Sequence, residues 1–320
     1  MSSLLVHTPV TPCLSRNCVR HQNTARRGAF VSRAGRLAVR SAVDDSLPGP
    51  SSWNLEGAPD GVVLQLARRM ETAWRALPDV QDAPIDSDLK SVDAIAPDGD
   101  PNTKVRIENL VFTNPKFRKM HLEVAWGLGG LEVMHVVVYP WASVQAPIYA
   151  ADLVAFNGRV SLCIADTCPV DKGLSLPEEM VVASAELQKK MMTDQPDIEP
   201  RPVPEWSDQI LSKQNMVCIG PPKEDFEKQK QAAAFCEYAF ELFREYVQFV
   251  DAIEIEGNEK NQKYGGSTRD RLSQHVLFCE KQLENDKTRK ALERSMGVER
   301  TDRYMTQVLF DVTEGTPTEP

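Results

Sequence analysis

The sequence lacks the features that mark membrane-spanning, zinc-dependent or nucleotide-binding proteins. Its longest apolar stretch, around residues 133–139, is far shorter than the ~20 residues that a membrane-spanning helix needs. No CxxC pair, P-loop, GxSxG or HExxH motif is present. The glycine-rich segment 127–130 has no third glycine at the GxGxxG spacing and joins two predicted strands. Dinucleotide, nucleoside triphosphate and zinc hydrolase chemistry therefore all lack support.

Acidic residues and lysines are absent from the first 43 residues, which contain seven arginines. An arginine-rich, serine-rich, acid-free segment is typical of an organelle transit peptide. We expect residues 1–43 to be a disordered transit peptide that is removed after import, and we place the mature protein in the plastid stroma. A mitochondrial presequence and a disordered basic tail are the alternatives.

Positive charge is scarce in the rest of the chain. Of the 37 basic residues, 30 remain after residue 43, against 46 acidic residues, which gives a net charge of −16. Because phosphate neutralisation needs a basic surface, we expect no nucleic-acid partner. Five cysteines remain, an odd number without paired spacing, and we interpret them as reduced, mostly buried thiols with no metal site.

The hydrophobic pattern predicts a sheet between helices. A linker over 44–60 precedes a helix over 60–77 that Asp60 could cap, and 79–103 reads as a loop. Period-two apolar runs then predict strands over 105–112, 117–126, 131–139, 147–156 and 160–165. Helical spacing follows over 177–192, 223–250, 267–284 and 286–296. We predict an α/β fold, a three-layer α/β/α sandwich with a central, mainly antiparallel sheet. It forms a single domain over 61–313, followed by a disordered tail over 314–320.

Four ionisable side chains interrupt the apolar pattern of three neighbouring strands. Strand alternation places His135 and Asp152 among apolar residues, and it places His121 and Glu123 together on one face. Burying a carboxylate costs several kcal/mol unless it is paired. A lone strand histidine is more often a satisfied core residue, and His121 with Glu123 could be the wet side of an edge strand. If all four side chains point to one side, they form a cluster that can handle protons.

Seven segments of the chain resemble the ferredoxin-dependent bilin reductases, in the family's order over residues 105–312. The segments are FRKMHLE (117–123), MHVVVYP (134–140), ADLV (151–154), GRVSLCIAD (158–166), PRPVPEW (200–206), NDKTRKALE (285–293) and RYMTQVLFDV (303–312). The resemblance implies a monomeric enzyme that reduces biliverdin IXα by four electrons to phycocyanobilin. Reduction proceeds through bilin radicals, with the D-ring vinyl group before the A-ring. It also implies that the enzyme binds no cofactor of its own and takes electrons from reduced [2Fe-2S] ferredoxin.

The resemblance also assigns catalytic roles. Asp152 matches the central acid and His135 the histidine paired with it at the terminal lactam. Glu123 matches the acid beside the D-ring vinyl group, and His121 a supporting histidine. We expect burial to make Asp152 a proton donor near neutral pH, and we expect His135 to favour its charged form.

Binding residues follow from the same resemblance. Arg201 and Lys287 match positions that grip the propionates, Ser161 matches a pocket serine, and Asn285 begins the segment that contains Lys287. A docking patch for acidic ferredoxin is predicted from the basic clusters Lys116, Arg118, Lys119, Lys287, Arg289, Lys290 and Arg294.

Two alternatives stay open. One is a bilin reductase of different regiospecificity, with dihydrobiliverdin or phycoerythrobilin as its product. The other is a non-catalytic bilin carrier, which would use Arg201 and Lys287 but would not need Asp152.

Overall fold

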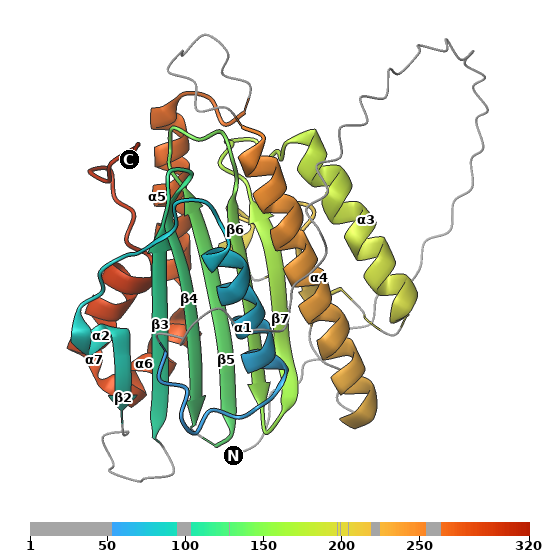
Figure 1. Cartoon of the computed structure of the whole chain (residues 1–320), viewed down its shortest axis with the longest axis vertical. Helices are drawn as coiled ribbons and strands as arrows, with labels where there is room; N and C mark the ends of the chain where they lie inside the picture. Colours follow the sequence, from blue (N-terminus) through green and yellow to red (C-terminus); the bar gives the residue numbers. More distant parts are fainter. Residues whose placement is uncertain are drawn as a thin grey trace. The chain divides into compact units, whose positions relative to one another are not determined.

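An eight-stranded antiparallel sheet forms the centre of the protein in the computed structural model (Figure 1). The structure describes residues 53–94, 104–127, 129–196, 198, 200–203, 205–218, 225–253 and 264–320. The predicted transit peptide, 1–43, and the first part of the predicted linker lie outside these residues. None of the described helices is long and apolar enough to cross a membrane.

The strands follow one another in space almost as they do in the sequence. They are β1 (Gln81–Asp82), β2 (Ser91–Ala94), β3 (Val105–Thr113), β4 (Phe117–Gly127), β5 (Leu131–Pro140), β6 (Ile148–Phe156), β7 (Arg159–Cys168) and β8 (Met216–Cys218). Their order is β1-β3-β4-β5-β6-β7-β8, with β2 also paired to β3. All five predicted strands are confirmed, each to within three residues at either end.

Three short edge strands and one short helix contradict the sequence prediction. The predicted loop over 79–103 contains β1, helix α2 (Ser87–Lys90) and β2, and β8 was not predicted. These strands are two to four residues long and show no clear period of two. They form because the outer edges of β3 and β7 present backbone N–H and C=O groups that a neighbouring segment can pair.

Helices cover both faces of the sheet and confirm the three-layer fold. One face packs against α1 (Val62–Arg75) and α4 (Asp225–Asp251), and α3 (Glu178–Asp194) packs against α4 (Figure 1). The other face packs against α5 (Thr268–Leu283), α6 (Asp286–Met296) and a π-helix (Tyr304–Leu309), and α7 (Val298–Arg303) packs against α6 and the π-helix. Because side chains alternate along a strand, Met120, Leu122 and Met134 face the first layer, whereas Val137 and Tyr139 face the second.

The segment before α1 and the last residues of the chain pack more closely on the fold than the sequence suggests. Trp53, in the predicted linker, is buried in the core beneath α1, and α1 begins at Val62 after Gly61, without a side-chain cap from Asp60. Residues 314–320, predicted to be a disordered tail, are described, and the backbone N–H of Ser143 donates to the carbonyl of Thr318. Burial of Trp53 and this backbone bond explain why the segment that begins at Trp53 and residues 314–320 adopt defined positions.

Two residues of the predicted docking patch lie in the interior instead. The guanidinium of Arg118 makes a bidentate pair with Asp311, at 2.9 and 3.0 Å. The ammonium of Lys119 lies 3.1 Å from Asp311 and donates to the carbonyl of Val308 at 2.5 Å. The side chains of Arg118 and Lys119 are only 13% and 6% exposed, so neither can contact a protein partner.

The buried Arg118–Lys119–Asp311 cluster ties β4 to the segment after the π-helix, and it predicts how stability depends on pH. Burial alone would raise the pKa of Asp311, but the hydrogen bond from Arg118 and the charges of Lys119 and Arg118 outweigh it and lower the pKa to about 2. A carboxyl with a lowered pKa stabilises the fold above its unfolded-state pKa. That stabilisation is lost as the pH falls through the folded value.

Asp311→Asn should therefore destabilise the protein by about 3 kcal/mol at neutral pH, because it leaves two buried cations without their counter-charge. Urea unfolding at neutral pH and at stepwise lower pH tests this, and the difference from wild type should shrink towards about pH 2. Asp93→Asn, in an exposed pair with Lys104, is the matched control and should change stability by less than about 1 kcal/mol. An equal effect of the two substitutions at neutral pH would contradict the role of the cluster.

Candidate active site

Strand register brings polar side chains from four strands into one row. Asn109 on β3 lies opposite Glu123 on β4, Glu123 lies opposite His135 on β5, and His135 lies opposite Asp152 on β6. Residues directly opposite each other across paired strands project from the same face of the sheet. His121 lies two residues before Glu123 on β4, so its side chain projects from the same face. All four ionisable groups therefore project from one side of the sheet, which is the condition for a cluster that can handle protons.

The centre of the row is a short hydrogen bond between His135 and Asp152. Nδ1 of His135 lies 2.5 Å from Oδ1 of Asp152. Burial, the largest single influence, lowers the pKa of His135, but the charge of Asp152 and its hydrogen bond outweigh burial and leave the pKa above its usual value. With Nδ1–H donated to Asp152, the charged ring still carries a proton on Nε2. The Asp152 carboxylate therefore favours the charged form of His135.

The row runs from a buried end to an accessible end. Glu123 is 7% exposed and His121 is fully buried. The side chain of Asp152 is 36% exposed, so it is not the deeply buried carboxylate that we expected. Three apolar neighbours on this face of β5, β6 and β7 are also only half-buried: Val133, Val154 and Ile164. The covering helices thus leave the Asp152 end open to a bound molecule.

Two buried residues complete the closed end of the row. The hydroxyl of Tyr304, at the start of the π-helix, lies 2.5 Å from Oε2 of Glu123 and 2.8 Å from Oδ1 of Asn109. Nε2 of His121 lies 2.8 Å from the same Asn109 oxygen. Burial, followed by the nearby charges of Lys119 and His135, lowers the pKa of His121 well below its usual value. His121 is therefore the neutral partner of His135, whose ring centre is 5.8 Å away.

Asn109 and Tyr304 were missed as site residues in the sequence. Asn109 shares its strand face with Val105, Ile107 and Val111, and a polar residue among apolar ones is the signal that identified Asp152. The same pattern in the sequence marks Asn109 as a candidate site residue. Tyr304 carries no such signal, because it approaches the sheet from a distant part of the chain.

The predicted binding residues lie away from this row or in other roles. The Oγ of Ser161 donates to the carbonyl of Val154 on the neighbouring strand. The Oδ1 of Asn285 accepts from the N–H of Thr288 and so caps α6. Lys287 is exposed in the first turn of α6, and Arg201 is exposed where its N–H pairs with Val217 of β8. Their substrate-binding roles stay predictions.

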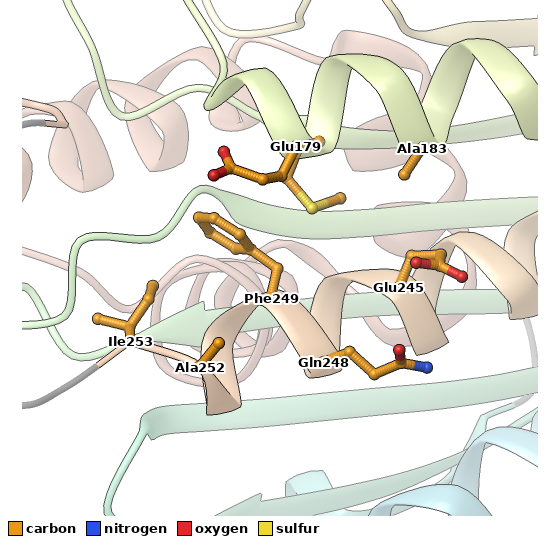
Figure 2. A pocket seen from close by; sticks show the side chains of 8 residues that line it. Glu179, Ala183, Glu245, Gln248, Phe249, Ala252 and Ile253 are labelled. Carbon is orange, nitrogen blue, oxygen red and sulfur yellow. The ribbon is translucent and has the colours of Figure 1, made fainter. Parts of the chain in front are cut away.

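A hollow of about 440 Å³ lies elsewhere, between α3 and α4 (Figure 2). Phe249 and Ile253 give it an apolar wall, and Glu179 and Glu245 lie at its lining. Both helices cover the face of the sheet opposite the polar row. The hollow is therefore separate from the candidate active site.

Removing the Asp152 charge should lower the pKa of His135, because the largest contribution that opposes burial would then be lost. The ring signals of His135, followed by NMR against pH and assigned by their loss in His135→Gln, measure this in Asp152→Asn. The internal control is His275, whose pKa burial lowers to about 3, so its ring should stay neutral near pH 7 in both proteins. An unchanged titration of His135 in Asp152→Asn would contradict the pairing.

Comparisons with known proteins agree on one family. The model of the ferredoxin-dependent bilin reductases matches residues 67–311. A phycocyanobilin:ferredoxin oxidoreductase of Trichodesmium erythraeum is 29% identical over 250 residues, 78% of this chain and 93% of that protein. One from Synechococcus sp. (strain CC9605) is 32% identical over 252 residues, 78% of this chain and 92% of that protein. A crystal structure of tomato phytochromobilin synthase in complex with biliverdin matches with a TM-score of 0.60 at 15% identity, covering 80% of this chain and 85% of that one, which shows a shared fold. This chain therefore belongs to the ferredoxin-dependent bilin reductases, a family of oxidoreductases.

Proposed function

We propose that this protein reduces biliverdin IXα to phycocyanobilin with four electrons from reduced ferredoxin. The observation that carries the proposal is the row of Glu123, His135 and Asp152 on one partly open face of the sheet. The relatives named phycocyanobilin:ferredoxin oxidoreductase support it. We further propose that the enzyme holds no redox cofactor, is a monomer, and enters the plastid through the signal in residues 1–43.

The row suits a substrate that receives electrons from outside and must receive protons in step with them. An extended conjugated pigment accepts an electron more easily once it is protonated. The charged His135 ring has Nε2–H available for this, and Asp152 stabilises the charge on the ring. In the described part of the chain, Nε2 of His135 is buried and has no hydrogen-bond partner, as expected for an atom that donates to a substrate group when substrate binds. Glu123 supplies a second proton source two strands from Asp152.

The two acids, at opposite ends of the row, are proposed to protonate different parts of the substrate. Asp152, at the accessible end, handles the first protonation together with His135. Glu123, at the buried end, serves the D-ring vinyl group, which is reduced before the A-ring. The Glu123 side chain thereby favours phycocyanobilin as the product over dihydrobiliverdin or phycoerythrobilin.

Substitutions of these two acids should separate enzyme from carrier. Asp152→Asn should slow biliverdin loss by at least about 100-fold while biliverdin still binds, because general acid catalysis contributes about that much. Glu123→Gln should stop vinyl reduction while A-ring chemistry continues. The measurement is anaerobic incubation with biliverdin, ferredoxin and a ferredoxin-reducing system, followed by chromatography of the pigments.

Asp93→Asn, on the exposed edge strand β2, is the control and should turn over as wild type does. Unchanged biliverdin with the wild-type protein would end the enzyme proposal and favour a carrier. Full phycocyanobilin formation by Glu123→Gln would instead rule out the proposed role of Glu123.

Ferredoxin is proposed to dock on the exposed cations of α6. With Arg118 and Lys119 buried, the exposed members of the predicted patch on α6 are Lys287, Lys290 and Arg294. The apolar side of α6, Leu292 and Met296, packs on the same core layer as the polar row. Attraction between these cations and an acidic partner would offset the long-range repulsion expected from the acidic chain.

Charge reversal at one position of α6 should weaken docking. Arg294→Glu should raise the KM for ferredoxin several-fold at low ionic strength, and the difference should shrink as salt screens the charges. Arg68→Glu makes the same change of net charge on α1, which covers the opposite face of the sheet, and it is the matched control. Equal effects of the two variants on steady-state kinetics would show that α6 is not the docking site.

A further inference from the structure

The orientation of the Asn109 amide fixes the hydrogen-bond directions at the closed end of the row. Its Nδ2 donates to the carbonyl of Leu89 at 3.0 Å. The carbonyl of Lys90 lies 3.5 Å from the same nitrogen. A flipped amide would place two oxygens against each other there, so the nitrogen must face Leu89. Oδ1 of Asn109 therefore faces His121 and Tyr304.

Two groups meet this oxygen, and both must donate to it. Nε2 of His121 and the hydroxyl of Tyr304 each lie 2.8 Å from Oδ1 of Asn109. An amide oxygen has two lone pairs and no proton. His121 is therefore the tautomer with its proton on Nε2, and the single hydroxyl proton of Tyr304 points to Asn109.

The contact between Tyr304 and Glu123 then needs a proton from Glu123. Their oxygens are 2.5 Å apart, a distance at which two oxygens without a shared proton repel each other. Tyr304 has already given its proton to Asn109, and burial raises its pKa well above the usual value, so it is not a phenolate. The remaining donor is the carboxyl O–H of Glu123.

We infer that Asn109 and Tyr304 are positioning residues that hold Glu123 as the protonated carboxylic acid, with its proton directed at the Tyr304 oxygen. This inference rests on the proposed function for its consequence, since a protonated Glu123 is the form that can give a proton to the substrate. The proton would leave the Glu123 oxygen for a carbon of the bilin vinyl group, and the electrons would come from ferredoxin. The carboxylate left behind would face the Tyr304 oxygen until Tyr304 turned its O–H away from Asn109.

The charges around Glu123 are consistent with an acid that stays protonated. Burial raises the pKa of Glu123, the charge of His135 and a hydrogen bond donated by Tyr304 would lower it, and the charge of Asp152 raises it, with a net rise. His121 is neutral, and the ammonium of Lys119, on the same face of β4, is paired with Asp311. The hydrogen-bond directions make the contribution of Tyr304 that of an acceptor.

Infrared spectroscopy of the substrate-free, full-length protein tests the inference directly. Wild type at neutral pH should show the C=O stretching band of a protonated carboxyl, and Glu123→Gln should lack it. Raising the pH should remove the band only well above the ordinary glutamate range of about 4 to 5. Absence of any Glu123-dependent band at neutral pH would overturn the inference.

Variants of the two positioning residues should change this band in different ways. Asn109→Leu frees the Tyr304 proton to stabilise the carboxylate, so the midpoint of the band's titration should fall by about one pH unit, a tenfold change in the ionisation constant. Tyr304→Phe removes the acceptor of the Glu123 proton, so the band should move to higher frequency. Tyr139→Phe removes another buried hydroxyl from the same face of the sheet and should leave the band unchanged.

An unchanged midpoint in Asn109→Leu, or an unmoved band in Tyr304→Phe, would overturn the corresponding role. If Asn109→Leu fails to fold, the wild-type, Glu123→Gln and Tyr304→Phe spectra still decide the protonation state. In turnover, Asn109→Leu should shift the pH profile of vinyl reduction downwards by the same amount, with unchanged binding of biliverdin. Because the spectra need no turnover, a protein that shows the band but leaves biliverdin unchanged would refute only the proposed function.

Discussion

The register of strands β3 to β6 is the constraint on which the active site depends. A slip of one residue between any two of these strands would send every side chain of one strand, including its site residues, to the opposite face. The alternation of large apolar residues on both faces prevents such a slip, since it would also expose Leu122 or Met134 to the wrong layer. The same packing that builds the core thus aligns Asn109, Glu123, His135 and Asp152 without any loop to position them.

The C-terminal segment covers the buried end of this row of polar side chains, where Asn109 and Glu123 lie. The π-helix begins at Tyr304 and places its hydroxyl between Asn109 and Glu123. Wider helical turns of this kind are uncommon and occur frequently at functional sites. Near the other end of the π-helix, the Lys119 ammonium donates a hydrogen bond to the carbonyl of Val308. Asp311, just after this helix, pairs with Arg118 and Lys119. The Arg118–Lys119–Asp311 cluster therefore helps to hold the π-helix, and with it Tyr304, against the sheet.

Two acids of similar intrinsic strength meet different surroundings along the row. Glu123 is enclosed by the π-helix and the sheet, whereas Asp152 is partly exposed and forms a hydrogen bond with His135. Environments that separate the protonation of neighbouring carboxyls are a recurrent way for one site to hold both an acid and an anion at the same pH. Here the second layer covers Glu123 on β4 more completely than Asp152 on β6.

The sequence by itself determined the central strands, the principal helices and, within single strands, the shared face of His121 and Glu123 and the apolar surroundings of His135 and Asp152. All of these follow from local periodicity, because side-chain direction along a strand or helix depends only on residue spacing. The family followed from short motifs in order. Only the tertiary structure decided that Arg118 and Lys119 are buried, that Asn285 caps a helix, and that Trp53 belongs to the core. It alone brought Tyr304 to Glu123, 181 residues away along the chain. The direction of a proton in that contact depends on which groups meet in space, and no spacing in the sequence encodes such a meeting.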